Sequence, residues 1–135
     1  MVTIHFCKIL IVDDTQLFRE KIKIILHDVK IGYKCYFAKD GKEAISQYIA
    51  HRPHVTIMDI KIQNLDGVKT SELIIKFDPN AKIIVISTKD NQEIINVVIK
   101  SRFVNYYVFK PCDSSAILMT VSKILSAKKK MKIVT

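Results

Sequence analysis

Short apolar runs that end at a polar residue recur along this chain. They lie at residues 8–12, 55–58, 83–86 and 106–109, and most of their members are β-branched or aromatic. Runs of this length and composition are typical of strands buried on both faces of a parallel sheet. We therefore expect a sheet whose strands end at the polar residues that follow these runs.

Other segments show a second strand pattern or the spacing of apolar residues that is typical of helices. They lie at about residues 15–27, 33–38, 42–51 and 68–77, and two further helical segments begin near Asp90 and Asp113. Asp14 or Thr15 can cap the first helix. Strands that alternate with helices predict an α/β fold, with a five-stranded parallel sheet covered by helices on both faces.

The helical spacing also predicts which side chains face the core. The expected inward positions of the first three helices are Leu17, Phe18, Ile22, Ile25 and Leu26, then Ala44, Ile45, Tyr48 and Ile49, then Val68, Leu73, Ile74 and Phe77. The last helix is expected to carry Ile117, Leu118, Val121, Ile124 and Leu125.

Length and composition favour one globular domain over residues 1–135, because the chain shows no linker and no repeat. No apolar stretch is long enough to insert into a membrane, and the first residues lack the features of a secretory leader. The three cysteines have scattered spacing that fits neither a zinc site nor a disulfide framework. A reducing cytoplasm is therefore the expected compartment.

The net charge of +9 raises the question of nucleic-acid binding. Most of the 22 basic residues are lysines spread along the chain, and the one basic run, at residues 128–132, follows the last helix pattern. No aromatic residue is interleaved with that run, and no recognition-helix pattern accompanies it. We expect the charge to be mainly a solvated surface, with nucleic acid not a partner.

The polar residues after the apolar runs are Asp13-Asp14, Asp59, Ser87 and Lys110. In open parallel sheets, ligands bind outside the carboxyl ends of the strands, so these side chains are expected to converge. Three neighbouring carboxylates repel one another unless a cation lies between them. Mg²⁺ fits such an oxygen-rich set, and the absence of Cys and His at these strand ends disfavours Zn²⁺.

This arrangement points to phosphoryl chemistry. A carboxylate beside Mg²⁺ can attack phosphorus and form an aspartyl phosphate, while Lys110 neutralises charge and Ser87 donates a hydrogen bond. A phosphatase of the haloacid dehalogenase type would need an acid at position 61, where Lys61 stands. A flavodoxin would need a phosphate-binding loop where Asp13-Asp14 stand, so both enzyme classes are disfavoured.

Over about residues 6–127, the chain resembles the receiver domain of response regulators, the CheY-like family, with residues 128–135 as a basic tail. The motifs that carry the resemblance are Ile9-Leu10-Ile11-Val12-Asp13-Asp14, Ala38-Lys39-Asp40-Gly41-Lys42-Glu43-Ala44, Met58-Asp59, Asp66-Gly67, Ile86-Ser87 and Lys110-Pro111. The resemblance implies a flavodoxin-like sheet with strand order 2-1-3-4-5.

The resemblance also implies a role for each site residue. Asp59 corresponds to the phosphoacceptor, which takes a phosphoryl group from a histidine kinase or phosphotransfer protein. Asp13, Asp14 and Asp59 correspond to the Mg²⁺ pocket, which the backbone carbonyl of Lys61 completes. Ser87 and Lys110 correspond to the residues that contact the phosphoryl group, and Tyr107 to the switch aromatic.

Such a protein signals rather than acting as an enzyme, and it catalyses only its own phosphorylation and dephosphorylation. Phosphorylation would remodel the face formed by the fourth helix, fifth strand and fifth helix, which binds an output partner. In chemotaxis that partner would be a flagellar motor switch or a phosphatase. The alternative is a basic receiver that acts in transcriptional regulation or on nucleic acid.

Two positions have rivals, and one loop departs from the family pattern. Thr88 competes with Ser87 for the phosphoryl contact, and Tyr106 competes with Tyr107 for the switch position. The usual Met-Pro of the loop after the phosphoacceptor is replaced by Ile62-Gln63, which leaves the strength of Mg²⁺ binding open.

Lys61 and Lys89 predict slow loss of the phosphoryl group. They stand two residues beyond Asp59 and Ser87, at positions that in this family border the path of the hydrolytic water. Lysine offers no carboxylate or amide to orient that water. We expect a long-lived phosphorylated form when its decay is followed after removal of the phosphodonor; a half-life under a minute would contradict this.

Overall fold

Five parallel strands form one sheet in the computed structural model of this protein, which describes residues 7–13, 15–27, 33–60, 66–88, 96, 100, 106–110 and 116–125. The strands are β1 (Cys7–Val12), β2 (Tyr33–Ala38), β3 (Val55–Asp59), β4 (Ile83–Thr88) and β5 (Tyr106–Lys110). Their order is β2-β1-β3-β4-β5, and all neighbouring pairs are parallel. The predicted fold class and strand order are therefore confirmed.

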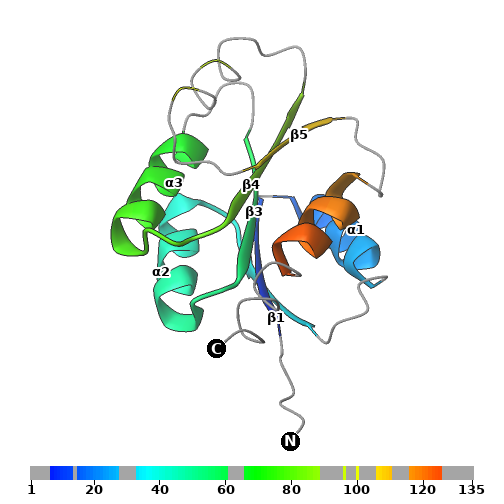
Figure 1. The fold of residues 1–135 in the computed structure, drawn as a ribbon, viewed down its shortest axis with the longest axis horizontal. Coiled ribbons are helices and arrows are strands. Elements are labelled where there is room, and N and C mark those ends of the chain that lie inside the picture. Colours follow the sequence, from blue (N-terminus) through cyan, green and yellow to red (C-terminus); the bar gives the residue numbers. More distant parts are fainter. Residues whose placement is uncertain are drawn as a thin grey trace, which may run out of the picture.

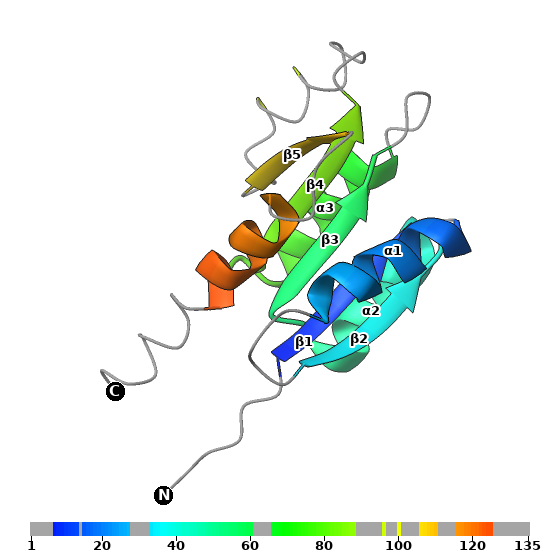
Figure 2. The ribbon, with the colours of Figure 1, turned by 90° about the vertical axis from the view of Figure 1, so that its right-hand side faces the viewer.

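Helices cover both faces of this sheet (Figure 1). The described helices are α1 (Gln16–Leu26), α2 (Gly41–His51), α3 (Asp66–Phe77) and a helix at residues 116–125. Figures 1 and 2 show α2 and α3 on one face of the sheet and α1 with helix 116–125 on the other. The helix predicted to begin near Asp90 lies outside the described residues. No described helix has the length and apolar character that a membrane crossing needs.

Two apolar clusters make up the core, one on each face of the sheet. The cluster beneath α1 and helix 116–125 has buried members that include Ile9, Ile22, Ile57 and Val121. The cluster beneath α2 and α3 has buried members that include Leu10, Tyr48, Met58 and Ile74. Both clusters take alternate residues of the same strands, as expected for a sheet that is buried on both faces.

Four of the positions predicted to be inward are exposed: Leu17 (82%), Ile49 (51%), Leu73 (50%) and Phe77 (42%). The first three are each the chain neighbour of a residue that does face the core. Adjacent residues of a helix point about 100° apart, and at these three places only the neighbour turns toward the sheet. Phe77 lies at the border of the stripe that buries Ile74.

The α3 helix begins close against the end of β3, and Gly67 permits this approach. A Cβ atom at Gly67 would lie 2.7 Å from Cγ1 of Ile60, the residue that follows β3. Asp66 and Gly67, one of the motifs that carry the resemblance, belong to the first turn of α3. A larger residue at position 67 would push α3 away from the strand end.

The structure describes two of the cysteines, Cys7, which is buried, and Cys35, which is half-buried. Burial raises the pKa of the Cys35 thiol, and the positive charge of Lys23 offsets this effect only in part. A thiol with a raised pKa is a weak nucleophile at neutral pH. Cys35 therefore behaves as a half-buried apolar residue at neutral pH, and Cys112 lies outside the described residues.

Replacing Thr56 with valine is expected to stabilise the fold. The Thr56 side chain is fully buried, and its Oγ1 makes no hydrogen bond with any described residue. Removing a buried hydroxyl that has no partner should raise the free energy of unfolding by about 1 kcal/mol. Denaturant unfolding of Thr56→Val measures this change.

The matched control is Thr120→Val in helix 116–125. The Thr120 hydroxyl donates a hydrogen bond of 2.8 Å to the Ala116 carbonyl, so its removal should bring no gain in stability. Equal effects of the two substitutions would contradict the interpretation of Thr56.

Candidate functional site

The strand register brings the predicted site residues to one edge of the sheet. In the β1–β3 pair the last matched residues are Val12 and Met58, so the next residues, Asp13 and Asp59, stand side by side. Asp59 is also paired with Ile86 of β4. Parallel pairing thus places both acids at the carboxyl ends of adjacent central strands, as the sequence predicted.

Hydrogen bonds fix the Asp13 carboxylate in one orientation. Asp13 is 3% exposed, and its Oδ2 accepts a bond of 2.9 Å from the Thr15 backbone N–H and a second bond from the Thr15 hydroxyl. The other oxygen, Oδ1, is buried and has no hydrogen-bond partner among the described residues. One carboxylate oxygen is therefore held by the protein and the other remains available to a ligand.

Helix α1 supplies this restraint from its first turn. Thr15 is the N-cap residue, and its hydroxyl accepts from the Phe18 N–H at 3.4 Å, which settles the choice between Asp14 and Thr15 as the cap. Arg19 donates from Nη1 to the Asp13 carbonyl oxygen at 2.8 Å. The Asp13 N–H donates to the Ala38 carbonyl of β2 at 2.9 Å, so Asp13 is held from two sides.

Sequence analysis did not find the roles of Thr15 and Arg19 toward Asp13. A threonine two residues after an aspartate can form such a side-chain turn, and this is the signal that could have been used. The arginine contact crosses six positions and depends on the path of the chain after β1. Nothing in the local pattern predicted it.

The acid pair fits a hard cation in part. A buried carboxylate oxygen without a hydrogen-bond donor, next to a second carboxylate at a strand end, suits an ion that prefers oxygen ligands. Within the described ranges, no group of three or more His, Cys, Asp or Glu side chains lies close enough to hold a metal. The predicted ligands Asp14 and Lys61 lie outside these ranges, so the described residues supply only Asp13 and Asp59.

The remaining predicted site residues are placed by their backbone alone. Ser87 is paired with Phe109, and Thr88 is paired with Lys110, at the carboxyl ends of β4 and β5. The side chains of Ser87, Thr88 and Lys110 lie outside what the structure describes. The choice between Ser87 and Thr88, and the role of Lys110, therefore stay predictions.

The two candidate switch residues lie next to each other in β5. Tyr106 is paired with Ile84 and is partly buried against the core cluster beneath α1 and helix 116–125. Tyr107 is paired with Val85, and its side chain lies outside the described set. The assignment of the switch to Tyr107 stays a prediction.

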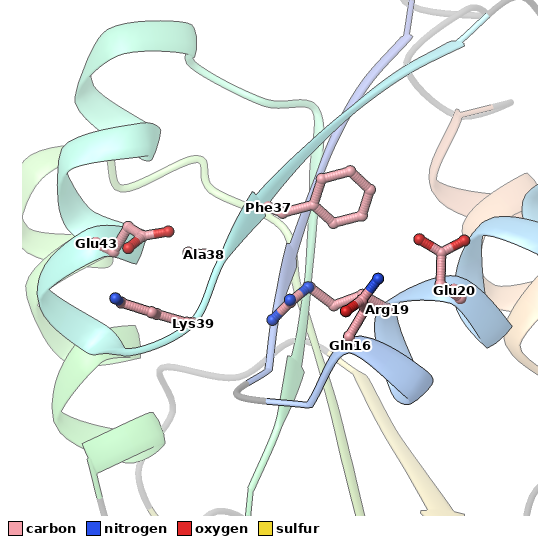
Figure 3. Close-up of a pocket in the computed structure, with 7 residues that line it drawn as sticks. All are labelled: Gln16, Arg19, Glu20, Phe37, Ala38, Lys39 and Glu43. Carbon is pink, nitrogen blue, oxygen red and sulfur yellow. The ribbon is translucent and has the colours of Figure 1, made fainter.

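A cavity of about 310 Å³ lies at the carboxyl end of β2, lined in part by Arg19 and Ala38, which both contact Asp13. Figure 3 shows the residues that line it on both sides of this strand: Gln16, Arg19 and Glu20 from α1, Phe37, Ala38 and Lys39, and Glu43 from α2. Arg19 connects the cavity to the site, because the same side chain binds the Asp13 carbonyl. The lining carries two acids and two bases and thus has no excess charge.

Comparison with known proteins agrees with this geometry. The family model described as the response regulator receiver domain matches residues 9–122. The chain is 34% identical to the chemotaxis protein CheY of Thermotoga maritima over 118 residues, which cover 87% of this chain and 96% of that protein. It is 30% identical to the transcriptional regulatory protein DegU of Brevibacillus brevis over 117 residues, 87% of this chain and 49% of that protein.

Solved structures show the same fold. The crystal structure of a CheY-like response regulator receiver domain protein from Methanospirillum hungatei JF-1 matches with a TM-score of 0.79 at 21% identity. The match covers 94% of this chain and 99% of that chain.

Replacing Thr15 with alanine is expected to loosen the first turn of α1 and the Asp13 carboxylate together. Loss of the N-cap alone should lower the free energy of unfolding by about 1 kcal/mol. Thr15→Ser keeps the hydroxyl and should behave like the natural protein in the same denaturant titration. A Thr15→Ser variant as unstable as Thr15→Ala would show that the hydroxyl is not the stabilising group.

Proposed function

This chain belongs to the family of response regulator receiver domains, and from this premise we propose that it accepts a phosphoryl group on Asp59 in a two-component phosphorelay. The donor is the phosphohistidine of a histidine kinase or of a phosphotransfer protein. The observation that carries the proposal is the adjacency of Asp13 and Asp59 at the carboxyl edge, with one Asp13 oxygen buried and free of hydrogen bonds among the described residues.

Receiver domains of this type depend on Mg²⁺ in general, and we propose the same for this chain. Asp13 and Asp59, together with Asp14 and the carbonyl oxygen of Lys61, would hold the ion. When bound, it would neutralise the charge that gathers on the phosphoryl oxygens. The hydrogen bonds from Thr15 would keep the Asp13 carboxylate in place before the ion arrives.

The reaction itself is a transfer between two nucleophiles. A carboxylate oxygen of Asp59 forms the new P–O bond while the P–N bond to the donor imidazole breaks, and the electron pair of that bond returns to the imidazole nitrogen. The Lys110 ammonium would offset the negative charge on the phosphoryl group, and the Ser87 hydroxyl would donate a hydrogen bond to one of its oxygens. The protein therefore catalyses its own modification and processes no other substrate.

The signal would leave the site through the last strands. Movement of Ser87 toward the phosphoryl group would let Tyr107 turn inward and change the surface formed around β5. An output protein binds this surface, and the similarity to CheY favours a chemotaxis partner such as a flagellar motor switch or a phosphatase. We place this activity in the cytoplasm.

A role in transcription is the second candidate, favoured by the similarity to DegU and by the net charge of +9. It predicts DNA binding that weakens steeply as salt is raised at near-neutral pH. Titration of the chain with duplex DNA at several salt concentrations separates the two candidates. Binding that is absent at all of them would leave only the protein partner.

Incubation with acetyl phosphate and Mg²⁺ is expected to add one phosphoryl group to the chain, detected by intact mass. The adduct should be absent in Asp59→Asn, and it should be strongly reduced in Asp13→Asn and after chelation of the metal, because both changes leave the phosphoryl charge uncompensated.

The matched control is Asp40→Asn. Asp40 caps α2 by accepting from the Glu43 N–H at 2.8 Å, and asparagine caps equally well, so this variant should be phosphorylated normally. An adduct that persists in Asp59→Asn would assign the phosphoacceptor elsewhere. A natural chain that gains no adduct would refute the phosphorelay function.

A further inference from the structure

Three large apolar side chains lie exposed on α2 and α3, although the sequence pattern predicts them to face the core. Ile49 on α2 is 51% exposed, and Leu73 and Phe77 on α3 are 50% and 42% exposed. Ile45, one turn before Ile49, is partly buried at the border of the core beneath these helices. We call Ile45, Ile49, Leu73 and Phe77 the α2–α3 stripe.

The two helices run side by side in the same direction, so the members of the stripe form two neighbouring rows. At one end, the first residue of α2, Gly41, lies directly against the Thr70 side chain of α3. At the other end, the rings of Tyr48 and Phe77 meet edge to face with centroids 6.3 Å apart. The two residues of each contact are separated by the same number of positions in the sequence. The helices are therefore parallel and stay in the same register along their length.

The stripe is held in shape by contacts beneath it and at its end. The buried Tyr48 donates a hydrogen bond of 2.8 Å to the Asp78 carboxylate, which ties α2 to the residue after α3. The guanidinium of Arg52 lies 4.3 Å from the centroid of the Phe77 ring. The two helices and the Phe77 ring are thus positioned before any partner arrives.

Arg52 adopts an unusual backbone conformation at this position. It is the C-cap of α2 and adopts a left-handed conformation, φ 50° and ψ 61°, that normally falls to glycine. Among the described residues it is the one non-glycine residue with positive φ. Glycine is the usual residue in this conformation, yet an arginine stands here with its side chain stacked on the exposed Phe77 ring. We take this as a sign that the contact between Arg52 and Phe77 has a role of its own.

The exposed charges around the stripe are predominantly basic. Every charged side chain described as exposed on α2, its C-cap and α3 is basic: Lys42, Arg52, Lys69 and Lys76. The acids Glu43 and Glu72 are half-buried, and Glu72 lies 3.3 Å from the Lys76 ammonium. A surface with an apolar centre and a mainly basic border suits an acidic partner better than a second copy of itself.

These features fit the apolar side of an acidic helix better than other occupants. Residues spaced by four positions on two parallel helices match the i, i+3, i+4 and i+7 anchors of an amphipathic helix. A membrane surface would favour apolar side chains that protrude further than these, which are exposed to 51%, 50% and 42%. Nucleic acid would stack on a free ring, whereas Phe77 is already covered by Arg52.

We propose that the α2–α3 stripe is a docking surface for an acidic amphipathic helix of a partner protein. Ile49, Arg52 and Phe77 stand at the carboxyl ends of their helices, which in a parallel α/β fold lie at the edge of the sheet opposite to Asp13 and Asp59. Docking is therefore independent of phosphorylation, and this proposal does not rest on the proposed function.

The test uses a designed helical peptide with leucine at i, i+3, i+4 and i+7 and glutamate at its other outward positions. The full chain, labelled with ¹⁵N, is titrated with this peptide and followed by NMR. We expect the amide signals of α2 and α3 to shift, with the same affinity for the chain and for its beryllofluoride-treated form.

Leu73→Ser should weaken binding by about tenfold or more, since it removes a central apolar contact. Ile49→Ser is a second variant that should act in the same direction if Leu73→Ser affects folding. The matched control is Ile24→Ser on α1, which removes an apolar side chain that is 72% exposed and should leave peptide binding unchanged.

The charge of the border is tested separately. Lys69→Glu should weaken binding several-fold at low salt, whereas Lys21→Glu on α1 should have no effect. A peptide with lysine in place of glutamate should not bind.

Four results would overturn the proposal. The first is a set of peptide-induced shifts outside α2 and α3, and the second is the absence of any shift. The third is stronger binding of the chain to vesicles of phosphatidylglycerol and phosphatidylcholine than to the peptide, with the same loss in Leu73→Ser. The fourth is self-association of the chain alone that Leu73→Ser abolishes. The last two would assign the stripe to a membrane or to a second copy.

Discussion

Parallel pairing of β1 with β3 is the constraint on which the site depends. Because the two strands run in the same direction and in register, the residues that follow them, Asp13 and Asp59, must emerge together. Two carboxylates at one strand edge repel, and the fold keeps them there because the strands are the most buried part of the molecule. Burial of the apolar core thus keeps Asp13 and Asp59 side by side, although their repulsion is unfavourable in the absence of a positive charge between them.

The residues around Asp13 convert this arrangement into a defined geometry. The Thr15 hydroxyl takes part in two hydrogen bonds, one that begins α1 and one that orients the carboxylate. Arg19, one turn later, holds the carbonyl of the same aspartate. The first turn of α1 and the Asp13 carboxylate are therefore held by one hydrogen-bond network. A change that loosens one of them should also loosen the other.

The parts that could be predicted from the sequence depend on local pattern. Short β-branched runs identify the strands, and a polar residue after each run identifies the edge where Asp13, Asp59, Ser87 and Lys110 emerge. The sequence could not decide between neighbouring apolar residues such as Tyr48 and Ile49, because the tilt of the helix on the sheet selects which one is buried. It also could not predict the contact from Arg19, which depends on the path of the chain between β1 and α1.

The hydrogen bonds on Asp13 also bear on which ion the site accepts. With Oδ2 engaged by Thr15, this carboxylate would offer the proposed cation mainly its other oxygen, Oδ1. Ca²⁺ takes six to eight oxygens and commonly uses carboxylates through both of theirs, whereas Mg²⁺ accepts single contacts and fills its remaining positions with water. If the site binds a metal as proposed, the threonine that caps α1 would thereby favour Mg²⁺ over Ca²⁺ through its hydrogen bonds to Asp13.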